Sequence, residues 1–433
     1  MADIVLKGNT SGSITIASPD VSGVNVLTLP VETGTILTTN TPLPEVSSVE
    51  FAGAGTSSGN ITITAPDTDE TNTLTLPETT GTFATENSLG MRNMIINGNM
   101  AIDQRYAGAS VTATSTTTVV DRLQMYAANI TNAQTYQQVT DAPAGFNNSF
   151  KVTNSSTTQS GTNALYSPRQ KIEGFNTAHL NWGTSDAQTV TLSFWVKASV
   201  TGTYPATLTN NNFSRSFVTS YTVSVANTWE YKTITIAGDT SGAWNVNNTT
   251  GINVMLSLDV EPAYQTSTVD AWQTANVRAT SSDVHFLANA SATWQITGLQ
   301  LEAGTTATPF ENLQYGQQLL LCQRYFEKSY SIGSSIPTST ALGSVSLFTS
   351  STANNYMVGS RPFVVSKRAA PTMVIYSPSG TAGTIADGNT TNLGAGAANQ
   401  IGTAGFALQN TSGGVITPAG NLIYFHFTAS AEL

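Results

Sequence analysis

Charged side chains are scarce in this sequence. Only 10% of its 433 residues are Asp, Glu, Lys or Arg, against about 25% in an ordinary soluble domain. Thr, Ser, Asn and Gly take their place, and these residues favour strands and turns rather than helices. The composition therefore predicts an all-β protein whose surfaces are polar but largely uncharged.

The charges that are present are mostly negative. Sixteen basic and 26 acidic residues give a net charge of −10, which leaves no basic footprint for nucleic acid or for an anionic membrane. No apolar run approaches the roughly 18 residues that cross a bilayer. We therefore expect no nucleic-acid partner and no membrane insertion. The opening MADIVLKGNTSGS lacks the apolar core of a secretion signal, so we also expect synthesis in a cytoplasm without export by that route.

Cysteine and histidine are almost missing. The one cysteine, Cys322, excludes an intrachain disulfide and a cysteine zinc site, and we expect it to be a small buried hydrophobe. His179, His285 and His426 are too far apart for a metal motif, and His426, within NLIYFHFTA, is expected to pack inside a strand. No nucleophile motif, phosphate loop or dinucleotide fingerprint is present. The sequence thus predicts no enzyme.

An internal repeat stands near the start. LTLPVETGTILTT at 27–39 returns as LTLPETTGTFATE at 74–86, and residues 8–39 align without a gap with residues 55–86 at a shift of 47. Each copy predicts an Ile-Thr-Ile strand, a Pro-Asp turn, a Leu-Thr-Leu strand and a final turn, with a connector at 41–55 between the copies. Two such strands are not stable alone. Stacked repeats, or copies of the chain wound about an axis, must cover them.

The rest of the chain divides into three further parts. Residues 91–312 carry many alternating apolar and polar runs between Asn, Gly, Ser and Thr clusters, which predicts an antiparallel two-sheet sandwich or jelly roll. A helical apolar pattern follows, in a connector over residues 313–330. Residues 331–433 return to strand patterns and predict a small C-terminal β-sandwich.

Four phrases of the middle domain resemble a known family. They are MRNMIINGNMAIDQR (91–105), VVDRLQMY (119–126), SFWVKAS (193–199) and ITGLQLEAGTTATPFE (296–311), followed by CQRYFEKSY and SKRAAPTMVIY. Their order resembles the carbohydrate-binding-module-like jelly-roll domain in tail fibres of tailed bacteriophages. The N-terminal TLPxxTGT repeats resemble the proximal parts of fibre proteins from marine and cyanobacterial phages.

The resemblance implies a virion tail fibre, made in the cytoplasm of a host bacterium and usually a parallel homotrimer. Residues 1–90 would form a trimeric shaft or attachment module that contacts other virion proteins. The distal β domains would bind a host-surface glycan without cleaving it. Leu123 stands where the family often has an aromatic residue, which weakens any binding role there. Two alternatives stay open: a virion adaptor or head fibre without host contact, and a tailspike that degrades host polysaccharide.

Tryptophan is the first guide to a glycan site, because aromatic faces cover sugar rings while polar groups bind hydroxyls. All six tryptophans lie in the middle domain. Trp195 alternates with the apolar set Val190, Leu192, Phe194 and Val196. It therefore faces solvent, or is covered by a loop or a second chain, and we take it as a glycan candidate. Trp229 and Trp294 enter strand patterns and are expected in the core.

Two further tryptophans lie in polar, loop-like sequence. Trp244 stands beside Asn245 and Asn247 in SGAWNVNNTTG, and Trp272 lies in VDAWQTANV. An indole flanked by amides is the combination that a sugar site requires. We therefore predict that Trp244, Trp272, Asn245 and Asn247 join Trp195 in contacting glycan.

Carboxylates suggest a metal site more readily than catalysis. Asp259 and Glu261 alternate along one predicted strand, where they could bind a structural calcium ion or simply be solvated. A glycosidase needs two carboxyl groups at a defined separation. Asp270 and Asp283 are close in sequence, but no pattern pairs them. We expect no catalytic residue and no cofactor other than a structural calcium ion.

Overall fold

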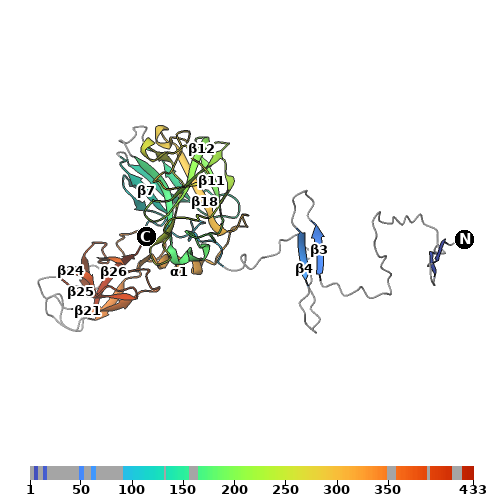
Figure 1. Cartoon of the computed structure of the whole chain (residues 1–433). Coiled ribbons are helices and arrows are strands. Elements are labelled where there is room, and N and C mark those ends of the chain that lie inside the picture. The colour runs from blue at the N-terminus through green and yellow to red at the C-terminus, as the bar shows by residue number, and fades with distance from the viewer. Residues whose placement is uncertain are drawn as a thin grey trace. The chain divides into compact units, whose positions relative to one another are not determined.

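A computed structural model of the chain shows two compact units, Met1–Thr82 and Phe83–Leu433, which are taken separately (Figure 1). The described residues are 4–7, 13–16, 48–52, 60–64, 91–130, 133–155, 164–348, 357–387, 391–411 and 422–433. Strands dominate these ranges, all of them paired antiparallel within the sheets, and one α-helix lies among them. The prediction of an all-β protein is confirmed. In the same ranges no helix is long and apolar enough to cross a membrane.

The first unit contains two short hairpins. β1 (Ile4–Lys7) pairs with β2 (Ser13–Ile16), and β3 (Ser48–Ala52) pairs with β4 (Asn60–Thr64). The Ile-Thr-Ile strand expected in each copy is therefore confirmed. The Leu-Thr-Leu strands and the turns around them lie outside the described residues.

The repeat is longer than its gap-free alignment suggests. β3 lies inside the stretch that we expected to be a connector, so that expectation is wrong. The register places Ile4 opposite Ile16 and Val49 opposite Ile63. Ile16 and Ile63 are equivalent in the alignment and are separated by the full shift of 47 residues. Their partners, Ile4 and Val49, are separated by two residues fewer. The sequence between the paired strands is two residues longer in the second copy, and a gap-free alignment therefore could not match the first strands of the two copies.

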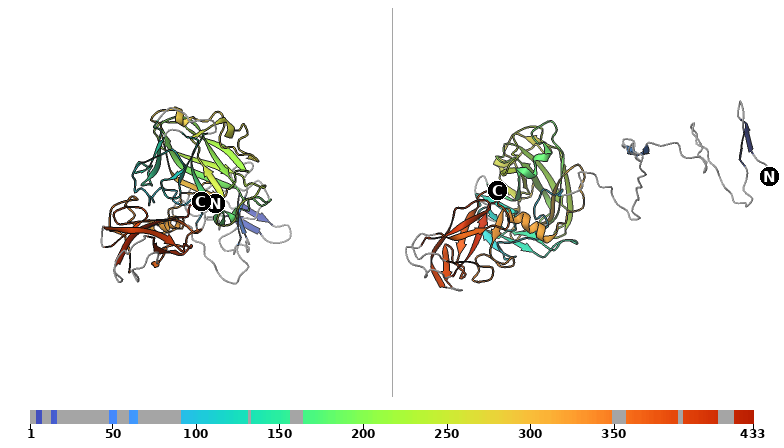
Figure 2. Two further views of the ribbon diagram at one scale, coloured as in Figure 1. Left: turned by 90° about the vertical axis from the view of Figure 1, so that its left-hand side faces the viewer. Right: turned by 90° about the horizontal axis from the view of Figure 1, so that it is seen from below.

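The middle domain is a sandwich of two antiparallel sheets, seen from two sides in Figure 2. Sheet I contains, in order, β17 (Trp272–Gln273), β13 (Ser216–Val223), β12 (Gly202–Thr209), β15 (Thr250–Met255), β10 (Leu165–Glu173), β7 (Gln124–Ala128) and β6 (Thr117–Thr118), with β16 (Asp259–Val260) paired to β10. Sheet II contains β14 (Glu230–Ile236), β11 (Val190–Ala198), β18 (Thr293–Ala303), β9 (Ser149–Thr153), β8 (Gln134–Val139) and β5 (Val111–Ala113). The chain crosses repeatedly between the sheets, as the jelly-roll prediction requires.

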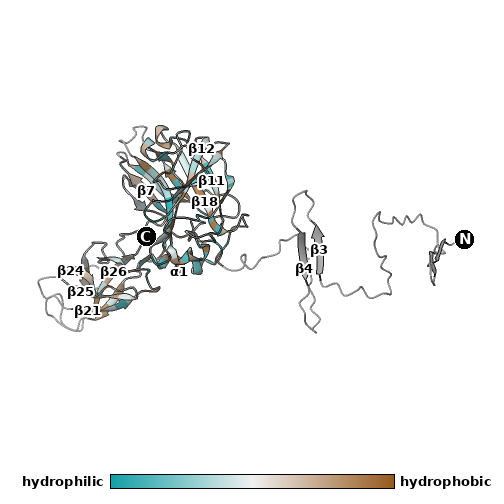
Figure 3. Cartoon of the chain, viewed as in Figure 1, coloured by the Kyte–Doolittle hydropathy of each residue, from teal (hydrophilic) through white to brown (hydrophobic). Residues whose placement is uncertain are grey.

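Strand alternation builds the core of this sandwich. On β11 the predicted inner set, Val190, Leu192, Phe194 and Val196, is fully buried, and Trp294 on β18 is as well. Apolar and polar residues alternate along such strands (Figure 3). Each large apolar side chain buried here contributes about 1.5–3 kcal/mol. Four short 3-10 segments, η2 (Gly174–Asn176), η3 (Ala178–Leu180), η4 (Pro262–Tyr264) and η5 (Phe286–Ala288), lie in its loops.

The connector is only partly helical. α1 (Tyr315–Gln323) ends well before residue 330, and β19 (Phe326–Lys328) already belongs to the C-terminal sheet. The expectation of one helical connector over residues 313–330 is therefore wrong in its second half. Cys322 is fully buried, as predicted, beside Ile102 and Tyr325.

The C-terminal sandwich is organised by its last strand. Its strands are β20 (Val345–Phe348), β21 (Met357–Pro362), β22 (Thr372–Tyr376), β23 (Thr384–Asp387), β24 (Thr391–Asn399), β25 (Gly405–Asn410) and β26 (Leu422–Ser430). The first half of β26 pairs with β20 and β23, and the second half pairs with β19 and β22. His426 is buried there, stacked on Tyr330 with centroids 3.8 Å apart. Its prediction as a packed strand residue is confirmed.

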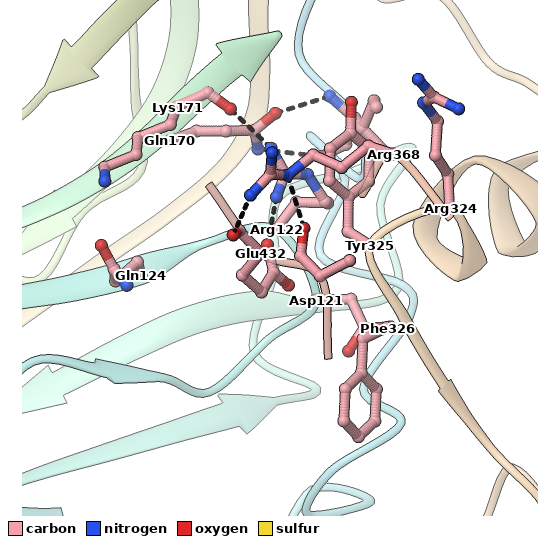
Figure 4. A network of polar contacts seen from close by, with 12 residues as sticks. Asp121, Arg122, Gln124, Gln170, Lys171, Arg324, Tyr325, Phe326, Arg368 and Glu432 are labelled. Atoms are coloured by element: carbon pink, nitrogen blue, oxygen red, sulfur yellow. Dashed lines mark hydrogen bonds and ion pairs between the residues drawn. The ribbon is translucent and has the colours of Figure 1, made fainter. Parts of the chain in front are cut away.

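A buried polar network joins the two sandwiches, and we call it the joint. It comprises Gln104, Arg105, Asp121, Arg122, Glu173, Arg324, Tyr325, Arg368 and Glu432. Figure 4 labels six of them: Asp121, Arg122, Arg324, Tyr325, Arg368 and Glu432. Arg122 and Arg105 both bind the carboxylate of Glu432, and Arg368 donates to the carbonyl of Glu432 at 2.6 Å. Most of these residues come from the phrases that resemble phage fibres. Those phrases therefore encode the attachment of one domain to the other.

Candidate functional site

Four aromatic side chains follow one another on the outer face of sheet II. Trp195 on β11 lies opposite Tyr231 on β14, with ring centroids 5.3 Å apart. Phe146 and Phe310 meet edge to face at 5.1 Å. We call Tyr231, Trp195, Phe146 and Phe310 the aromatic row. Each is half-buried or exposed, so part of every ring remains open to a ligand.

Gly298 on β18 lets the two pairs come together. Its φ is +62°, and a Cβ atom at this position would lie 2.8 Å from Cζ of Phe146 and 3.2 Å from Cδ1 of Trp195. The register between β11 and β18 shifts at this point. A glycine within a bulge thus allows both rings to pack over bare backbone, which makes the row continuous.

A polar cluster lies beside the aromatic row. Asp141 accepts hydrogen bonds from Nε2 of Gln295 (3.2 Å) and Nε1 of Trp229 (3.4 Å), and it pairs with Nζ of Lys197. The Lys197 ammonium also lies 5.4 Å from the Trp229 ring centroid. We call these four residues the Asp141 cluster. Because Lys197 is two positions from Trp195 on one strand, the cluster and the row share a face.

The cluster is suited to binding hydroxyl groups. The side chain of Asp141 is 48% exposed, and the hydrogen bond from Lys197 lowers its pKa below the ordinary value. Asp141 is therefore an ionised acceptor at neutral pH, while Lys197 and Gln295 supply donors. Trp229 was expected in the core, and that expectation is wrong. The indole is half-buried at the surface because it precedes β14 rather than lying within it.

The tryptophans predicted from polar sequence pack against each other. Trp182, Trp244 and Trp272 meet edge to face, with centroids 4.8–5.3 Å apart. The indole N–H of Trp272 donates to the carbonyl of Ala237 at 2.7 Å, and that of Trp244 to Ser241 at 3.2 Å. Trp272 also belongs to strand β17 rather than to a loop. Much of the surface of these rings is therefore covered by the neighbouring indoles, which leaves less of it for a sugar to contact.

The amides beside Trp244 organise their own loop. Asn245 donates through Nδ2 to Oγ1 of Thr249 (2.9 Å) and to the carbonyl of Thr250 (3.1 Å). Oδ1 of Asn247 accepts from both the backbone N–H and the hydroxyl of Thr249. These partners lie at or just before the start of β15 in sheet I, whereas Trp195 is on β11 of sheet II. Their contact with glycan stays a prediction.

Asp259 and Glu261 differ in their surroundings, since Asp259 is buried and Glu261 is half-buried. Both oxygens of Asp259 have partners, the N–H of Leu287 at 2.9 Å and Nδ1 of His285 at 3.2 Å, while Glu261 lies beyond the end of β16. Within the described ranges, no group of three or more His, Cys, Asp or Glu side chains could hold a metal ion. The calcium site therefore gains no support from geometry.

Two cavities differ from the open aromatic row, although Phe310 of the row lines the larger one. One of about 10 Å³ is lined by Asp259, Asp283 and His285 and has room for no sugar. Another of about 240 Å³ lies between α1 and the segment 91–98. The side chains of Asn93 and Asn97, which line it, are hydrogen-bonded to nearby backbone groups. Neither cavity offers the open array of rings and polar groups found on sheet II.

Comparison with known proteins gives structural neighbours but no family. No known family profile matches the sequence, and no curated protein matches it either. The enzymatically active domain of tailspike protein 4 of bacteriophage CBA120 is 12% identical over 49% of this chain, with a TM-score of 0.28, and the match spans 21% of that protein.

Carbohydrate-binding modules are also among the structural neighbours. A family 11 module from Clostridium thermocellum is 13% identical over 46% of this chain and 98% of its own, with a TM-score of 0.23. A family 4 module is 11% identical over 48% of this chain and 98% of its own, with a TM-score of 0.22. Similarity at this level adds nothing to what the two sheets already show about the fold.

Most of the row and its cluster could not be found from the sequence. Only Trp195 was singled out. Tyr231 lies opposite Trp195 through strand pairing, and Asp141 binds Lys197 from a loop that is distant in sequence. Phe310 is held by a loop in which Glu302 accepts from the N–H and hydroxyl of Thr308. The one available signal was the alternation of Tyr231 with Thr233 and Thr235 along an outer face.

Proposed function

We propose that this chain is a virion fibre protein that binds a host-surface glycan, without cleaving it, at the aromatic row and the Asp141 cluster. The observation that supports this best is the continuous row of four rings beside an ionised carboxylate, an amide and an ammonium group. Sugar rings stack their apolar faces on aromatic side chains, and their hydroxyls bind such polar groups. Trp195, Tyr231, Lys197 and Gln295 stand on the paired strands β11, β14 and β18, which fixes this part of the face before binding and lowers the cost of ordering it.

The wider assignment rests on the repeats and the resemblance. The hairpins of the first unit are too small to be stable singly, which favours assembly of several copies or a partner from the particle. We propose a homotrimer that attaches to other virion proteins through residues 1–90. Several weak sites on three chains would then act together, so that no single site needs high affinity.

The test is a glycan-binding assay with matched variants of the full-length protein. An array of bacterial surface polysaccharides identifies a ligand, and calorimetry then measures affinity. We expect Trp195→Ala and Tyr231→Ala each to lower affinity at least about tenfold, equivalent to ~1.4 kcal/mol. Thr233→Ala, on the same outer face, should leave affinity unchanged.

The possible outcomes test the location of the site and the proposed function separately. Glycan binding that survives both aromatic substitutions would move the site elsewhere while keeping the function. Binding to no polysaccharide would favour the adaptor alternative. Release of new reducing ends from a bound polysaccharide would overturn the non-cleaving assignment in favour of a depolymerase.

A further inference from the structure

The cavity of about 240 Å³ adjoins one end of the aromatic row, and we call it the end cavity. Phe310 belongs to both, because its ring meets Phe146 edge to face and also lines the cavity. Gly98 forms part of the wall, where a Cβ atom would collide with the carbonyl oxygen of Leu299 and lie 3.3 Å from Cε2 of Phe310. Only glycine permits this close approach. A glycan that follows the row past Phe310 therefore reaches the end cavity next.

The walls of the end cavity are mainly apolar and carry one negative charge. The aliphatic residues that line it are Met94, Ile95, Ile96, Leu313 and Leu321. The carboxylate of Glu311 lines it as well, and accepts hydrogen bonds from the backbone N–H groups of Arg92 (3.2 Å) and Asn93 (2.9 Å). Apolar walls favour an apolar group, while an anionic group would be repelled by Glu311. The occupant is therefore expected to be neutral and partly apolar.

Gln318 of α1 gives the end cavity a fixed hydrogen-bond acceptor. Its side chain lines the cavity and is only 5% exposed, and its Nε2 donates to Oδ1 of Asn99 at 2.8 Å. That oxygen also accepts from the N–H of Ala101 at 3.3 Å, so the Gln318 amide must turn its nitrogen toward Asn99 and its oxygen away. Oε1 of Gln318 accepts no hydrogen bond from a described residue, yet solvent can reach it. A ligand with a neutral N–H or O–H group would satisfy this acceptor.

Two polar side chains stand at the rim of the same cavity. Asn176 of η2 and His179 of η3 both line it and are exposed. Neither side chain forms a hydrogen bond with another described residue. Burial lowers the pKa of His179 below its ordinary value, so the ring is neutral at neutral pH and offers one donor and one acceptor. The cavity thus combines apolar walls, an acceptor inside and donors at its rim.

We propose that the end cavity takes the acetamido group of an N-acetylated sugar residue, in a glycan bound along the aromatic row. The methyl group contacts the apolar walls, the amide N–H donates to Oε1 of Gln318, and the carbonyl accepts from Asn176 or His179. An acetamido group is neutral, as the Glu311 carboxylate requires. A hydroxyl in its place would satisfy the acceptor but leave the apolar walls without a partner.

The size of the end cavity fits part of a glycan rather than a whole chain. Its volume of about 240 Å³ exceeds the roughly 150 Å³ of a cavity that binds benzene. It is smaller than the roughly 300 Å³ at which pockets for complete small molecules begin. One acetamido group and the ring edge that carries it therefore enter, while the rest of the glycan stays on the row. This inference rests on the proposed glycan binding and adds the class of sugar.

The test uses the full-length protein and a matched pair of neutral probes. N-acetylchitotetraose and cellotetraose share one β-1,4-linked backbone and differ only in the acetamido or hydroxyl group at carbon 2. We expect calorimetry to show at least about tenfold tighter binding of the acetylated probe. In saturation-transfer NMR, the acetamido methyl protons should receive the strongest signal from the protein.

Variants assign this preference to the end cavity. Gln318→Leu, which removes the acceptor at nearly constant size, should abolish the preference and leave the affinity for cellotetraose unchanged. The double variant Asn176→Ala with His179→Ala should do the same, and it decides the question if Gln318→Leu does not fold, because both side chains are exposed. Leu342→Ala, at a leucine that is 75% exposed, is the control and should keep the preference.

The outcomes distinguish this inference from the proposed function. Trp195→Ala should weaken both probes alike and keep their ratio, because it acts on the row and not on the end cavity. Equal affinity for the two probes, or a preference that survives both cavity variants, would overturn the acetamido site. Binding of neither probe by a protein that binds a bacterial polysaccharide would also overturn it, while glycan binding itself would stand. Binding to no polysaccharide would overturn both.

Discussion

Arg324 donates two hydrogen bonds to the carboxylate of Glu173, at 2.9 and 2.6 Å, and the hydroxyl of Tyr325 adds a third at 2.6 Å. Glu173 ends β10 of the middle sandwich, while Arg324 and Tyr325 follow α1. Burial alone would raise the pKa of Glu173, but these donors outweigh it and hold the pKa below its ordinary value. The joint between the domains therefore depends on an ionised carboxylate.

Glu173→Ala should destabilise the protein by about 1–3 kcal/mol, because three donors lose their acceptor. The loss stays below that of a fully buried pair, since the Arg324 side chain is 34% exposed and can be hydrated. Denaturant unfolding followed by tryptophan fluorescence measures this. Asp186→Ala, at an exposed carboxylate, is the control and should change stability by less than about 0.5 kcal/mol. Equal effects of the two substitutions would contradict the assignment.

The joint should also give the protein a characteristic pH dependence. Burial raises the pKa of Asp121 to about 6, against the opposing effect of Arg105. The folded state thus holds this proton more tightly than the unfolded chain. The protonated Asp121 side chain therefore stabilises the folded state fully below about pH 4, and this stabilisation is lost as the pH rises through about 6. The free energy of unfolding falls by an amount on the order of 3 kcal/mol, at about 1.36 kcal/mol per pKa unit.

Asp121→Asn isolates that contribution from the rest of the profile. Glu173 and Glu432, whose pKa values are lowered, act in the opposite sense: their stabilisation is present above the unfolded pKa and lost as pH falls. We expect the stability of the variant, relative to the unchanged protein, to rise between pH 4 and 7. Urea unfolding across this range measures the difference, and a pH-independent difference would show that Asp121 is not the group involved.

Gly298→Ala should disrupt the aromatic row. The substitution forces a Cβ atom against Phe146 and imposes a positive φ on alanine, which together cost about 1–3 kcal/mol. The midpoint temperature of thermal unfolding and the affinity for glycan should both fall. Gly316→Ala is a matched control, because that helical position has open space around it and should gain about 0.5–1 kcal/mol. Unchanged affinity in Gly298→Ala would separate the row from binding.

Trp272→Ala tests whether the tryptophan cluster is structural. Because Trp272 packs against Trp182, Trp244 and Phe217, its removal should cost about 2–4 kcal/mol. Trp195→Ala, on an open face, should cost less than half of that. The free energy of unfolding and the glycan affinity are measured for both variants. A loss of stability indicates a structural indole, and a loss of affinity alone indicates a binding indole. A stable Trp272→Ala protein that has lost glycan binding would support the sequence-based prediction instead.

Light scattering on a sizing column tests the proposed assembly. We expect a mass about three times the 45.4 kDa of the chain, since the hairpins of residues 1–90 need other copies to cover them. A species at the mass of a single chain would overturn the homotrimer and favour a separate partner protein for these repeats.

Local pattern predicted the fold class but not the partners of each strand. The alternation around Val190, Leu192 and Phe194 correctly identified a core-facing strand, because a strand's two faces follow directly from the order of its residues. β26 could be recognised as a strand, yet its four partners depend on contacts between distant segments. The end of α1 was missed because Tyr325 and Phe326 keep an apolar pattern while packing under Arg122 and Arg105.

The candidate site was predicted only at Trp195 for a similar reason. Its opposite position to Tyr231 and its closeness to Phe146 arise from pairing and from a bulge at Gly298, neither of which is marked in the local sequence. Polar surroundings pointed to Trp244 as an exposed indole. The surrounding loop instead folds so that the ring packs edge to face on Trp182, because a large apolar ring gains more from burial than its polar neighbours lose.

The end of β26 has a mechanical consequence. Ala431 and Glu432 follow that strand directly and are gripped by Arg368 from one sandwich and by Arg105 and Arg122 from the other. Separating the two domains would therefore have to break the contacts of Arg105 and Arg122 with the Glu432 carboxylate. The two residues that follow β26 thus act as a clasp between the domains, and the same short segment serves both the C-terminal sheet and the surface of the middle domain.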